Sequence, residues 1–133
     1  MSATFRFELV SPEEKLMSED VAQVTVPGEE GVFGVLPGHS PLLSAIKVGV
    51  IEIRRDATAP ARRIFVSGGF ADVGAEHCTV LAEEATDLTL VDVTKLDADI
   101  ARLEGEVSVA EEGLEKQRLA TRLEIAQAKR AAL

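Results

Sequence analysis

The segment VPGEEGVFGVLPGHSPLL, residues 26–43, places four glycines and three prolines in a run that is otherwise mainly apolar. The Pro-Gly pairs at 27–28 and 37–38 are typical of turns whose third residue needs a positive φ, which glycine adopts without a Cβ clash. Gly31 and Gly34 indicate a bulge or a tight bend between short strands. The segment is therefore expected to be a binding loop on a β scaffold, or else a compact cluster of turns that only shapes the domain.

The residues on both sides of this segment alternate between apolar and polar side chains. The chain is rich in valine and glycine up to about residue 93, and the alternation is clear in residues 5–9, 23–26 and 51–54. A period of two with one polar face is the pattern of half-buried strands. Further strands are expected at residues 63–66, 71–73, 78–81 and 88–91. Many short strands at close spacing predict a flattened β-sandwich or barrel of about ten strands.

The chain changes character at Thr94, after which glycine becomes scarce and proline is absent. Apolar residues then recur at alternating spacings of four and three, which is the stripe of an amphipathic helix. Thr94 followed by Asp97 resembles a capping pair and predicts that the helix begins at Thr94. The first stripe consists of Leu96, Ile100, Leu103, Val107 and Ala110, and a second stripe, out of phase with it, of Leu119, Leu123 and Ala126.

Gly113 lies at the phase break between the two stripes. It predicts an antiparallel helical hairpin, with one helix over residues 94–110 and the other over residues 114–132. A single long helix is the alternative, because glycine inside a helix costs only about 1 kcal/mol. The expected organisation is a β-sandwich domain over residues 1–92 and a two-helix hairpin over residues 93–133.

Charge is distributed unevenly along the chain. The formal net charge of −9 argues against nucleic acid as a partner, because no basic stripe is available to neutralise successive phosphates. In the tail, acidic residues dominate the first helix and the turn, whereas the second helix is basic. The two helices should attract each other, although exposed ion pairs contribute only about 0–1 kcal/mol each. The basic helix is either a docking surface for an acidic partner or an ordinary solvated face.

No arrangement of residues in the sequence indicates catalysis or a metal site. A nucleophile elbow at Ser67 would need glycine two residues earlier, where Phe65 stands. His39, His77 and Cys78 are the only histidines and the only cysteine, so a metal site would depend on carboxylates. Cys78 is expected to be a buried small hydrophobe. A Gly-Lys-Ser or Gly-Lys-Thr phosphate loop is also missing, so we predict a non-catalytic protein without a cofactor.

Hydropathy predicts no membrane span, because the longest apolar run is far shorter than about 20 residues. Residues 1–12 have neither the apolar core of a secretory signal nor the arginine-rich pattern of an organelle transit peptide. We therefore expect a bacterial cytoplasmic product that reaches a membrane only through a partner and does not insert into it.

Residues 28–43 resemble the signature loop of the epsilon subunits of bacterial F-type ATP synthases. The family pattern is a glycine, an acidic residue, Gly-x-Phe-Gly and then Pro-Gly-His with an apolar tail. Three further blocks match the family in the right order, at residues 7–28, 46–54 and 65–85. Four ordered blocks are far more specific than one glycine-rich loop, and they cover most of residues 5–85.

The resemblance implies a non-catalytic rotor subunit of the central stalk, which couples proton translocation to ATP synthesis. Its β domain would bind the gamma subunit and the polar loops of the c ring, so that the chain lies peripherally on the cytoplasmic face of the bacterial inner membrane. By their position in the motif, the residues of the ring-contact loop are Glu29, Glu30, Gly31, Phe33, Gly34 and His39.

The resemblance also implies a regulatory role for the hairpin. In the family the helices can extend into the catalytic head, formed by the alpha and beta subunits, and inhibit ATP hydrolysis. In this chain the basic residues suited to such a contact are Arg118, Arg122, Lys129 and Arg130.

Some family members bind ATP through a segment of isoleucine or leucine, aspartate, two free positions, arginine and alanine. Leu96, Asp97 and Ala101 match this motif, but Ile100 stands where the arginine is expected. Without that cation we predict weak ATP binding or none. A nucleotide-responsive regulator whose hairpin binds ATP is the alternative function, and a small hydrolase is a more distant third.

Overall fold

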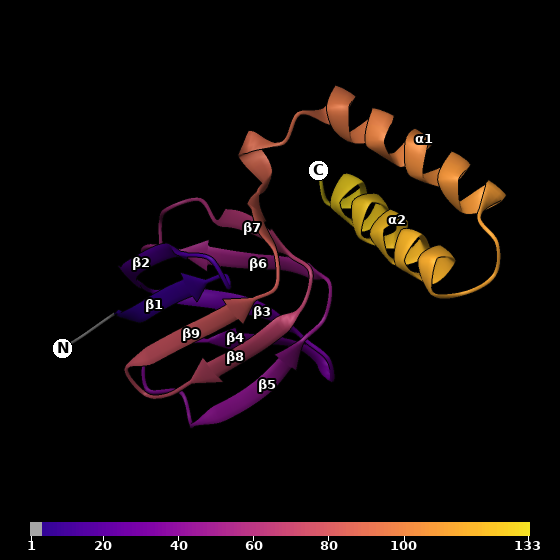
Figure 1. The fold of residues 1–133 in the computed structure, drawn as a ribbon. Coiled ribbons are helices and arrows are strands. Elements are labelled where there is room, and N and C mark those ends of the chain that lie inside the picture. The colour runs from indigo at the N-terminus through magenta and orange to yellow at the C-terminus, as the bar shows by residue number, and fades with distance from the viewer. Residues whose placement is uncertain (1–3) are drawn as a thin grey trace. The chain divides into compact units, whose positions relative to one another are not determined.

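The computed structural model describes residues 4–133 as ten strands, a 3₁₀ turn and two helices (Figure 1). Backbone contacts divide the chain into two compact units, the first ending at Asp87 and the second running from Leu88 to Leu133. The expected fold class, a flattened β-sandwich followed by a two-helix hairpin, is confirmed. The predicted domain boundary, after residue 92, stays a prediction.

The first unit is a curled sheet in which most neighbouring strands are antiparallel. Its strands are β1 (Phe5–Val10), β2 (Lys15–Val21), β3 (Gln23–Gly28), β4 (Gly31–Val35), β5 (Leu42–Ile46), β6 (Gly49–Arg54), β7 (Arg62–Val66), β8 (Gly69–Val73), β9 (His77–Ala82) and β10 (Ala85–Asp87). The order across the sheet is β10-β7-β6-β3-β5-β8-β9-β1-β2, and β4 pairs with β3 outside that path. Among the described strands, β1 and β9 form the one parallel pair.

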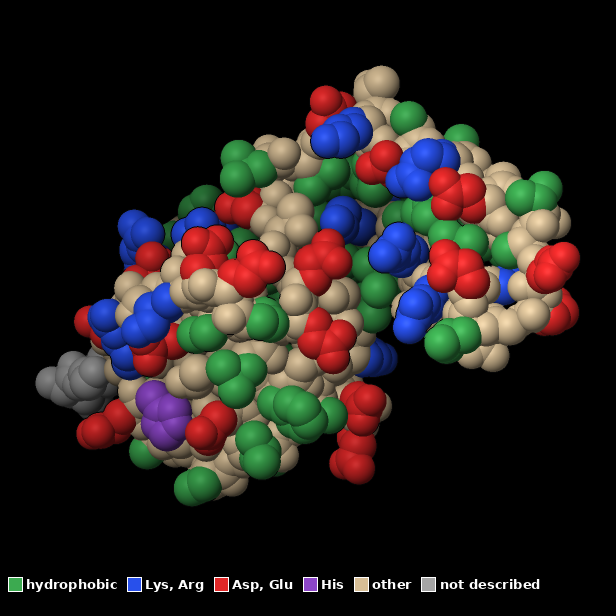
Figure 2. Space-filling view, viewed as in Figure 1, with side chains coloured by type: hydrophobic (Ala, Val, Ile, Leu, Met, Phe, Trp, Pro, Cys, Tyr) green, Lys and Arg blue, Asp and Glu red, His purple; other side chains and the backbone are tan. Residues whose placement is uncertain are grey.

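The alternation of apolar and polar residues places one face of each strand in a shared core. Phe5, Phe7 and Leu9 of β1 are buried, whereas Arg6 between them is exposed. No polar or charged side chain of residues 4–133 is buried, and Figure 2 shows Lys, Arg, Asp and Glu at the surface. Since each large apolar side chain contributes about 1.5–3 kcal/mol when buried, this core is the main source of stability for the sheet.

Cys78 lies in the core, as its position in the alternating pattern predicts. Burial raises the pKa of its thiol to about 12, and the charge of Asp72 acts in the same direction. The thiol therefore stays protonated near neutral pH, where a thiolate would be required for reactivity.

The prediction of a strand at residues 88–91 is wrong. β10 ends at Asp87, and Leu88–Leu90 forms the 3₁₀ turn η1. Two leucines separated by one residue satisfy a period of two, but so short a run does not distinguish a strand from a single turn.

The second unit is a hairpin of α1 (Val93–Val109) and α2 (Leu114–Ala132), so the alternative of one long helix is wrong. The chain turns at Gly113, whose φ of 144° is rarely adopted by residues with a Cβ. Leu96, Leu103 and Leu119, which belong to the two predicted apolar stripes, are buried.

Opposite charges meet across this hairpin. The Nε atom of Arg130 on α2 lies 2.8 Å from Oδ1 of Asp97 on α1. Both side chains are substantially exposed, so the pair contributes only about 0–1 kcal/mol. The predicted attraction between the acidic and basic helices is therefore present, but it is weak.

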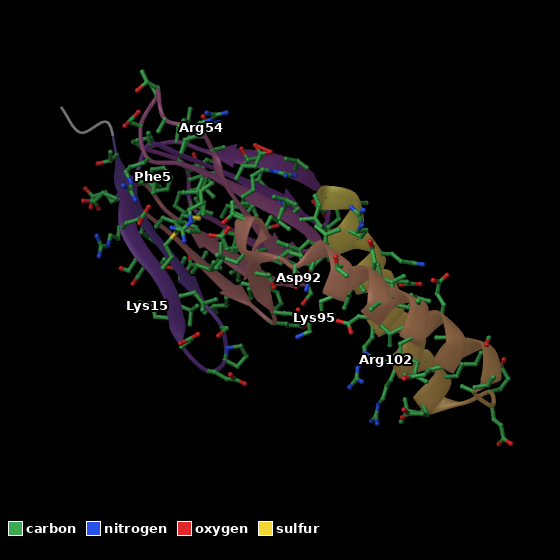
Figure 3. All side chains as sticks on the ribbon, turned by 90° about the horizontal axis from the view of Figure 1, so that it is seen from above. Phe5, Lys15, Arg54, Asp92, Lys95 and Arg102 are labelled. Atoms are coloured by element: carbon green, nitrogen blue, oxygen red, sulfur yellow. The ribbon has the colours of Figure 1, made fainter. Side chains whose placement is uncertain are left out.

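The N-cap of α1 is Asp92, and the prediction of Thr94 as the cap is wrong. The backbone N–H of Lys95 donates to Oδ1 of Asp92 at 3.1 Å, and Figure 3 places the two residues together at the start of α1. Thr94 lies within the first turn instead. Aspartate is at least as good a cap as threonine, and its charge also interacts favourably with the positive end of the helix dipole.

Replacing Asp92 with alanine should destabilise the hairpin by about 1 kcal/mol, because one N–H at the start of α1 loses its acceptor. Hydrogen exchange of the α1 amides measures this loss, which should appear as exchange about fivefold faster. Thr94→Ala is the matched control and should change the exchange rates much less. Equal acceleration in the two variants would contradict the assignment of the cap.

Candidate functional site

β3 and β4 form a hairpin whose tip consists of Glu29 and Glu30. Gly28 pairs with Gly31 across the turn, which leaves both glutamates exposed between them. Gly31 has a φ of 138°, so the bend predicted there is confirmed. Gly34, by contrast, lies in β4 in continuous register with β3, so the bulge or bend expected at this position is wrong.

Glycine is required at position 28 because a side chain has no room there, and not because the backbone needs a positive φ as predicted. It lies inside β3 and is not among the glycines with a positive φ. A Cβ atom at Gly28 would lie 2.8 Å from the backbone oxygen of Gly31 and 2.9 Å from Cε1 of Phe33. Phe33 is partly buried and packs against the core. Its ring therefore covers Gly28 and fixes the hairpin that carries the two glutamates.

Gly28→Ala should lower the free energy of unfolding by about 1–3 kcal/mol, since the added methyl group meets backbone and a packed ring. Gly34→Ala is the matched control, because the nearest atom to its Cβ would be Nε2 of Gln23, at 3.8 Å. That control should stay within about 0.5 kcal/mol of the parent chain. Urea unfolding curves compare the two variants, and equal midpoints would contradict the proposed packing of Phe33.

His39 lies in the loop that joins β4 to β5. Gly38 has a φ of 85°, as the Pro-Gly pair predicts, and its N–H donates to the carbonyl oxygen of Ala75 at 2.8 Å. The Nδ1 atom of His39 lies 2.6 Å from the carbonyl oxygen of Ser40. Because a carbonyl oxygen only accepts hydrogen bonds, this contact requires the proton on Nδ1. The imidazole is thus already engaged within its own loop.

The structure does not bring the two glutamates together with His39. Glu29 and Glu30 precede β4 and His39 follows it, so the five residues of that strand separate them. At about 3.3 Å per residue the strand spans roughly 13 Å. The two glutamates and His39, which were predicted to belong to one contact loop, therefore lie in two separate sites at opposite ends of β4.

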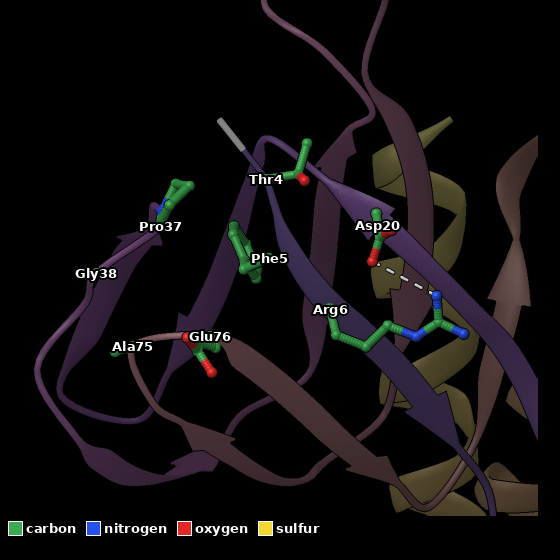
Figure 4. A pocket seen from close by; sticks show the side chains of 8 residues that line it. All are labelled: Thr4, Phe5, Arg6, Asp20, Pro37, Gly38, Ala75 and Glu76. Carbon is green, nitrogen blue, oxygen red and sulfur yellow. Dashed lines mark hydrogen bonds and ion pairs between the residues drawn. The ribbon is translucent and has the colours of Figure 1, made fainter. Parts of the chain in front are cut away.

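A depression in the surface lies beside the His39 loop (Figure 4). Arg6, on its rim, forms an ion pair with Asp20 at 3.5 Å and donates to the hydroxyl of Ser18 at 2.8 Å. Within residues 4–133 no three His, Cys, Asp or Glu side chains are grouped to hold a metal ion. The lining consists of Thr4, Phe5, Arg6, Asp20, Pro37, Gly38, Ala75 and Glu76. It contains no histidine or cysteine.

An apolar surface that sequence reasoning missed lies on the outer face of β5, β8, β9 and β1. Ala45 pairs with Phe70, Phe70 with Leu81, and Leu81 with Val10. Directly paired residues point to the same face, so these four side chains form one row, named here the outer row. Phe70 is 53% exposed and Leu81 52%, and Figure 2 shows hydrophobic side chains gathered over this side of the sheet.

A signal for the outer row was present in the sequence. Val80 and Ala82 of β9 are buried, so Leu81 between them occupies the position where alternation requires a polar residue. Phe70 also occupies a position where a polar residue is expected, next to the buried Ala71 of β8. A large apolar residue on the polar face of a strand is a sign of a second contact surface.

The four basic residues of α2 that were predicted to contact the catalytic head also form two separate pairs. Arg118 and Arg122 are exposed and lie one turn apart, and in the described part of the chain neither forms an ion pair or a side-chain hydrogen bond. Lys129 and Arg130 lie near the other end of α2, roughly 18 Å from Arg118 at 1.5 Å per residue. Arg130 is engaged with Asp97.

The residues that match the nucleotide motif are not arranged as an open site. Leu96 is buried in the hairpin, and the carboxylate of Asp97 is occupied by Arg130. Ile100, in place of the expected arginine, contributes no charge. Weak ATP binding or none stays a prediction, and titration of the chain with ATP tests it.

These features define a small β-sandwich protein with a helical hairpin, and comparison with known proteins places it in a family. Residues 4–87 match the model of the ATP synthase delta/epsilon chain beta-sandwich domain. The ATP synthase epsilon chain of Rhodospirillum centenum is 47% identical over 133 residues, covering 97% of this chain and 91% of that relative. The epsilon chain of Rhodospirillum rubrum is 44% identical over 128 residues, covering 96% and 95%. The chain therefore belongs to the ATP synthase delta/epsilon chain family, and the predicted resemblance to bacterial epsilon subunits is confirmed.

Solved structures agree with this assignment. A chain of the Euglena gracilis mitochondrial ATP synthase, in an assembly described as OSCP/F1/c-ring, superposes with a TM-score of 0.83 at 25% identity, over 99% of this chain and 82% of that one. A chain of the Tetrahymena thermophila central stalk and c-ring shares the fold, with a TM-score of 0.67 at 15% identity. None of the helices in residues 4–133 is both long and apolar enough to cross a membrane.

Proposed function

We propose that this chain is the non-catalytic epsilon subunit in the central stalk of a bacterial F-type ATP synthase. In the central stalk it binds both the gamma subunit and the c ring. By holding these two partners together it couples proton translocation to ATP synthesis. It lies on the cytoplasmic face of the inner membrane through these partners. The observation that carries the proposal is the exposed outer row, which spans four hydrogen-bonded strands, in a chain of this family.

The outer row is the surface we assign to the gamma subunit. Exposed apolar side chains that lie side by side mark protein interfaces more often than isolated ones do. A groove bordered by Phe70, Leu81 and Pro12 runs beside the row and gives a partner side chain a place to insert. Because the row spans four hydrogen-bonded strands, a partner bound there is held by the whole sheet, as transmission of torque requires.

The hairpin tip with Glu29, Glu30 and Gly31 is the part that we assign to the c ring. Phe33 supports this assignment, because its packing over Gly28 keeps the tip in one position. His39 falls outside the contact, since it lies at the opposite end of β4 and its imidazole is bonded within its own loop.

Phe70→Glu should weaken binding to ATP synthase stripped of its own epsilon subunit by at least tenfold, because it places a charge in an apolar interface. Val109→Glu is the matched control: Val109 is 82% exposed and belongs to the hairpin. Titration of fluorescently labelled chains onto the stripped complex measures both affinities. If Phe70→Glu bound as tightly as the parent chain, the outer row would not be the gamma-binding surface.

A second role, inhibition of ATP hydrolysis by the hairpin, is favoured by Arg118 and Arg122. Arg118 and Arg122 have no partner within residues 4–133, so these two cations on one face of α2 are suited to an acidic surface on the alpha or beta subunits. The contact between Arg130 and Asp97 opposes opening of the hairpin only weakly. The alternative role is a nucleotide-responsive regulator. The structure offers no support for it, because the carboxylate of Asp97 in the nucleotide motif is already paired with Arg130.

Arg118→Gln with Arg122→Gln should raise the rate of ATP hydrolysis by the reassembled complex several-fold over the complex with the parent chain. The matched control is Arg102→Gln with Lys116→Gln, which removes two charges whose partners are Glu106 and Glu112 in the same hairpin. The control should leave hydrolysis unchanged. Equal rates with and without the parent chain would show that the hairpin does not inhibit.

A further inference from the structure

β4 has a neighbouring strand on one side only. It pairs with β3 and with no other strand among the described residues. In an antiparallel pair, alternate residues turn their backbone N–H and C=O groups toward the partner, and the others turn them away. The carbonyl of Pro27 accepts from the N–H of Lys47, on the side of β5. Gly28, the next residue of β3, therefore turns its groups toward β4.

This alternation fixes which groups of β4 are free. Gly28 pairs with Gly31 and Val26 with Phe33, so Gly31 and Phe33 use their backbone groups on β3. Val32 and Gly34 then turn their N–H and C=O groups outward. Within the described part of the chain these outward groups form no hydrogen bond. The free edge of β4 thus offers donors and acceptors at the spacing of a further strand.

Residues 4–133 do not give β4 the usual protection of an edge strand. Natural edges are blunted by lysine, proline, bulges or a covering segment, whereas β4 reads GVFGV and keeps a continuous register. Val32 is 67% exposed, and Leu36, which follows the strand, is 56% exposed. Gly34 is also exposed and carries no side chain, so the backbone of another segment can approach closely.

We propose that β4 is a strand-addition site for an extended segment of a rotor partner, and that this segment carries a cation where it passes the hairpin tip. The exposed Glu29 and Glu30 form no ion pair in residues 4–133, so they supply the complementary charge. A second copy of this chain is disfavoured because each copy has a net charge of −9. The inference rests on the proposed rotor function and adds how the partner is held, through backbone pairing.

Val32→Pro tests the pairing, because proline removes the outward N–H at an edge position where it is sterically tolerated. Val32→Ala is the matched control, since it removes most of the same side chain and keeps the N–H. We expect Val32→Pro to bind stripped ATP synthase at least tenfold more weakly than Val32→Ala, with both chains folded by circular dichroism. Equal affinities would overturn the proposal.

Hydrogen exchange of the unmodified chain gives a test that does not depend on a variant folding. The peptide spanning residues 31–36 should exchange at least tenfold more slowly in the reassembled complex than in the free chain. If the unmodified chain binds and this peptide is not protected, the strand-addition proposal fails and the rotor function stands. If the unmodified chain does not bind, the rotor function fails and the inference falls with it.

Two further experiments test the identity of the segment that pairs with β4. Glu29→Gln with Glu30→Gln should weaken binding several-fold and reduce its dependence on salt, and an unchanged affinity would overturn the assignment of a cation. Sedimentation of the free chain should show a monomer. A dimer that Val32→Pro dissociates would identify a second copy as the occupant and would overturn the choice of a rotor partner.

Discussion

The junction between β3 and β5 is the constraint on which the rest of the structure depends. Among the described strands, the two halves of the sheet are joined at the pairing of Gly28 with Ile46. Two hydrogen bonds flank that pair, from Lys47 N–H to the carbonyl of Pro27 and from Glu29 N–H to the carbonyl of Ala45, each at 3.0 Å. Because β3 also carries β4, the hairpin tip is positioned directly by this junction.

In the proposed function, this arrangement lets a small domain connect two partners. The outer row lies on the half of the sheet that begins with β5, and the tip with Glu29 and Glu30 projects from β3. A load applied to one surface reaches the other through hydrogen-bonded strands and a core that is packed on both sides of the junction. Phe33, which covers Gly28, stiffens the shortest part of that route.

Periodicity in the sequence was sufficient for the fold class, the hairpin around Gly113 and the burial of Cys78, because each depends on local pattern. Prediction failed where two structures satisfy the same local pattern: both Thr94 and Asp92 are good caps, and Gly28 suits a turn as well as a crowded strand. Alternation in the sequence could single out Phe70 and Leu81, but their alignment with Ala45 and Val10 into the outer row required knowledge of strand register. The separation of Glu29 from His39 required knowledge that β4 lies between them. Both are properties of pairing, which a single sequence does not display.

The most direct test of the central claim is ATP-driven proton pumping by membranes whose ATP synthase has been stripped of its own epsilon subunit. Added chain should bind to the complex and restore pumping in proportion to hydrolysis, because it reconnects the central stalk to the ring. A chain that binds but leaves hydrolysis uncoupled from pumping would contradict the account of this protein as a coupling element of the rotor.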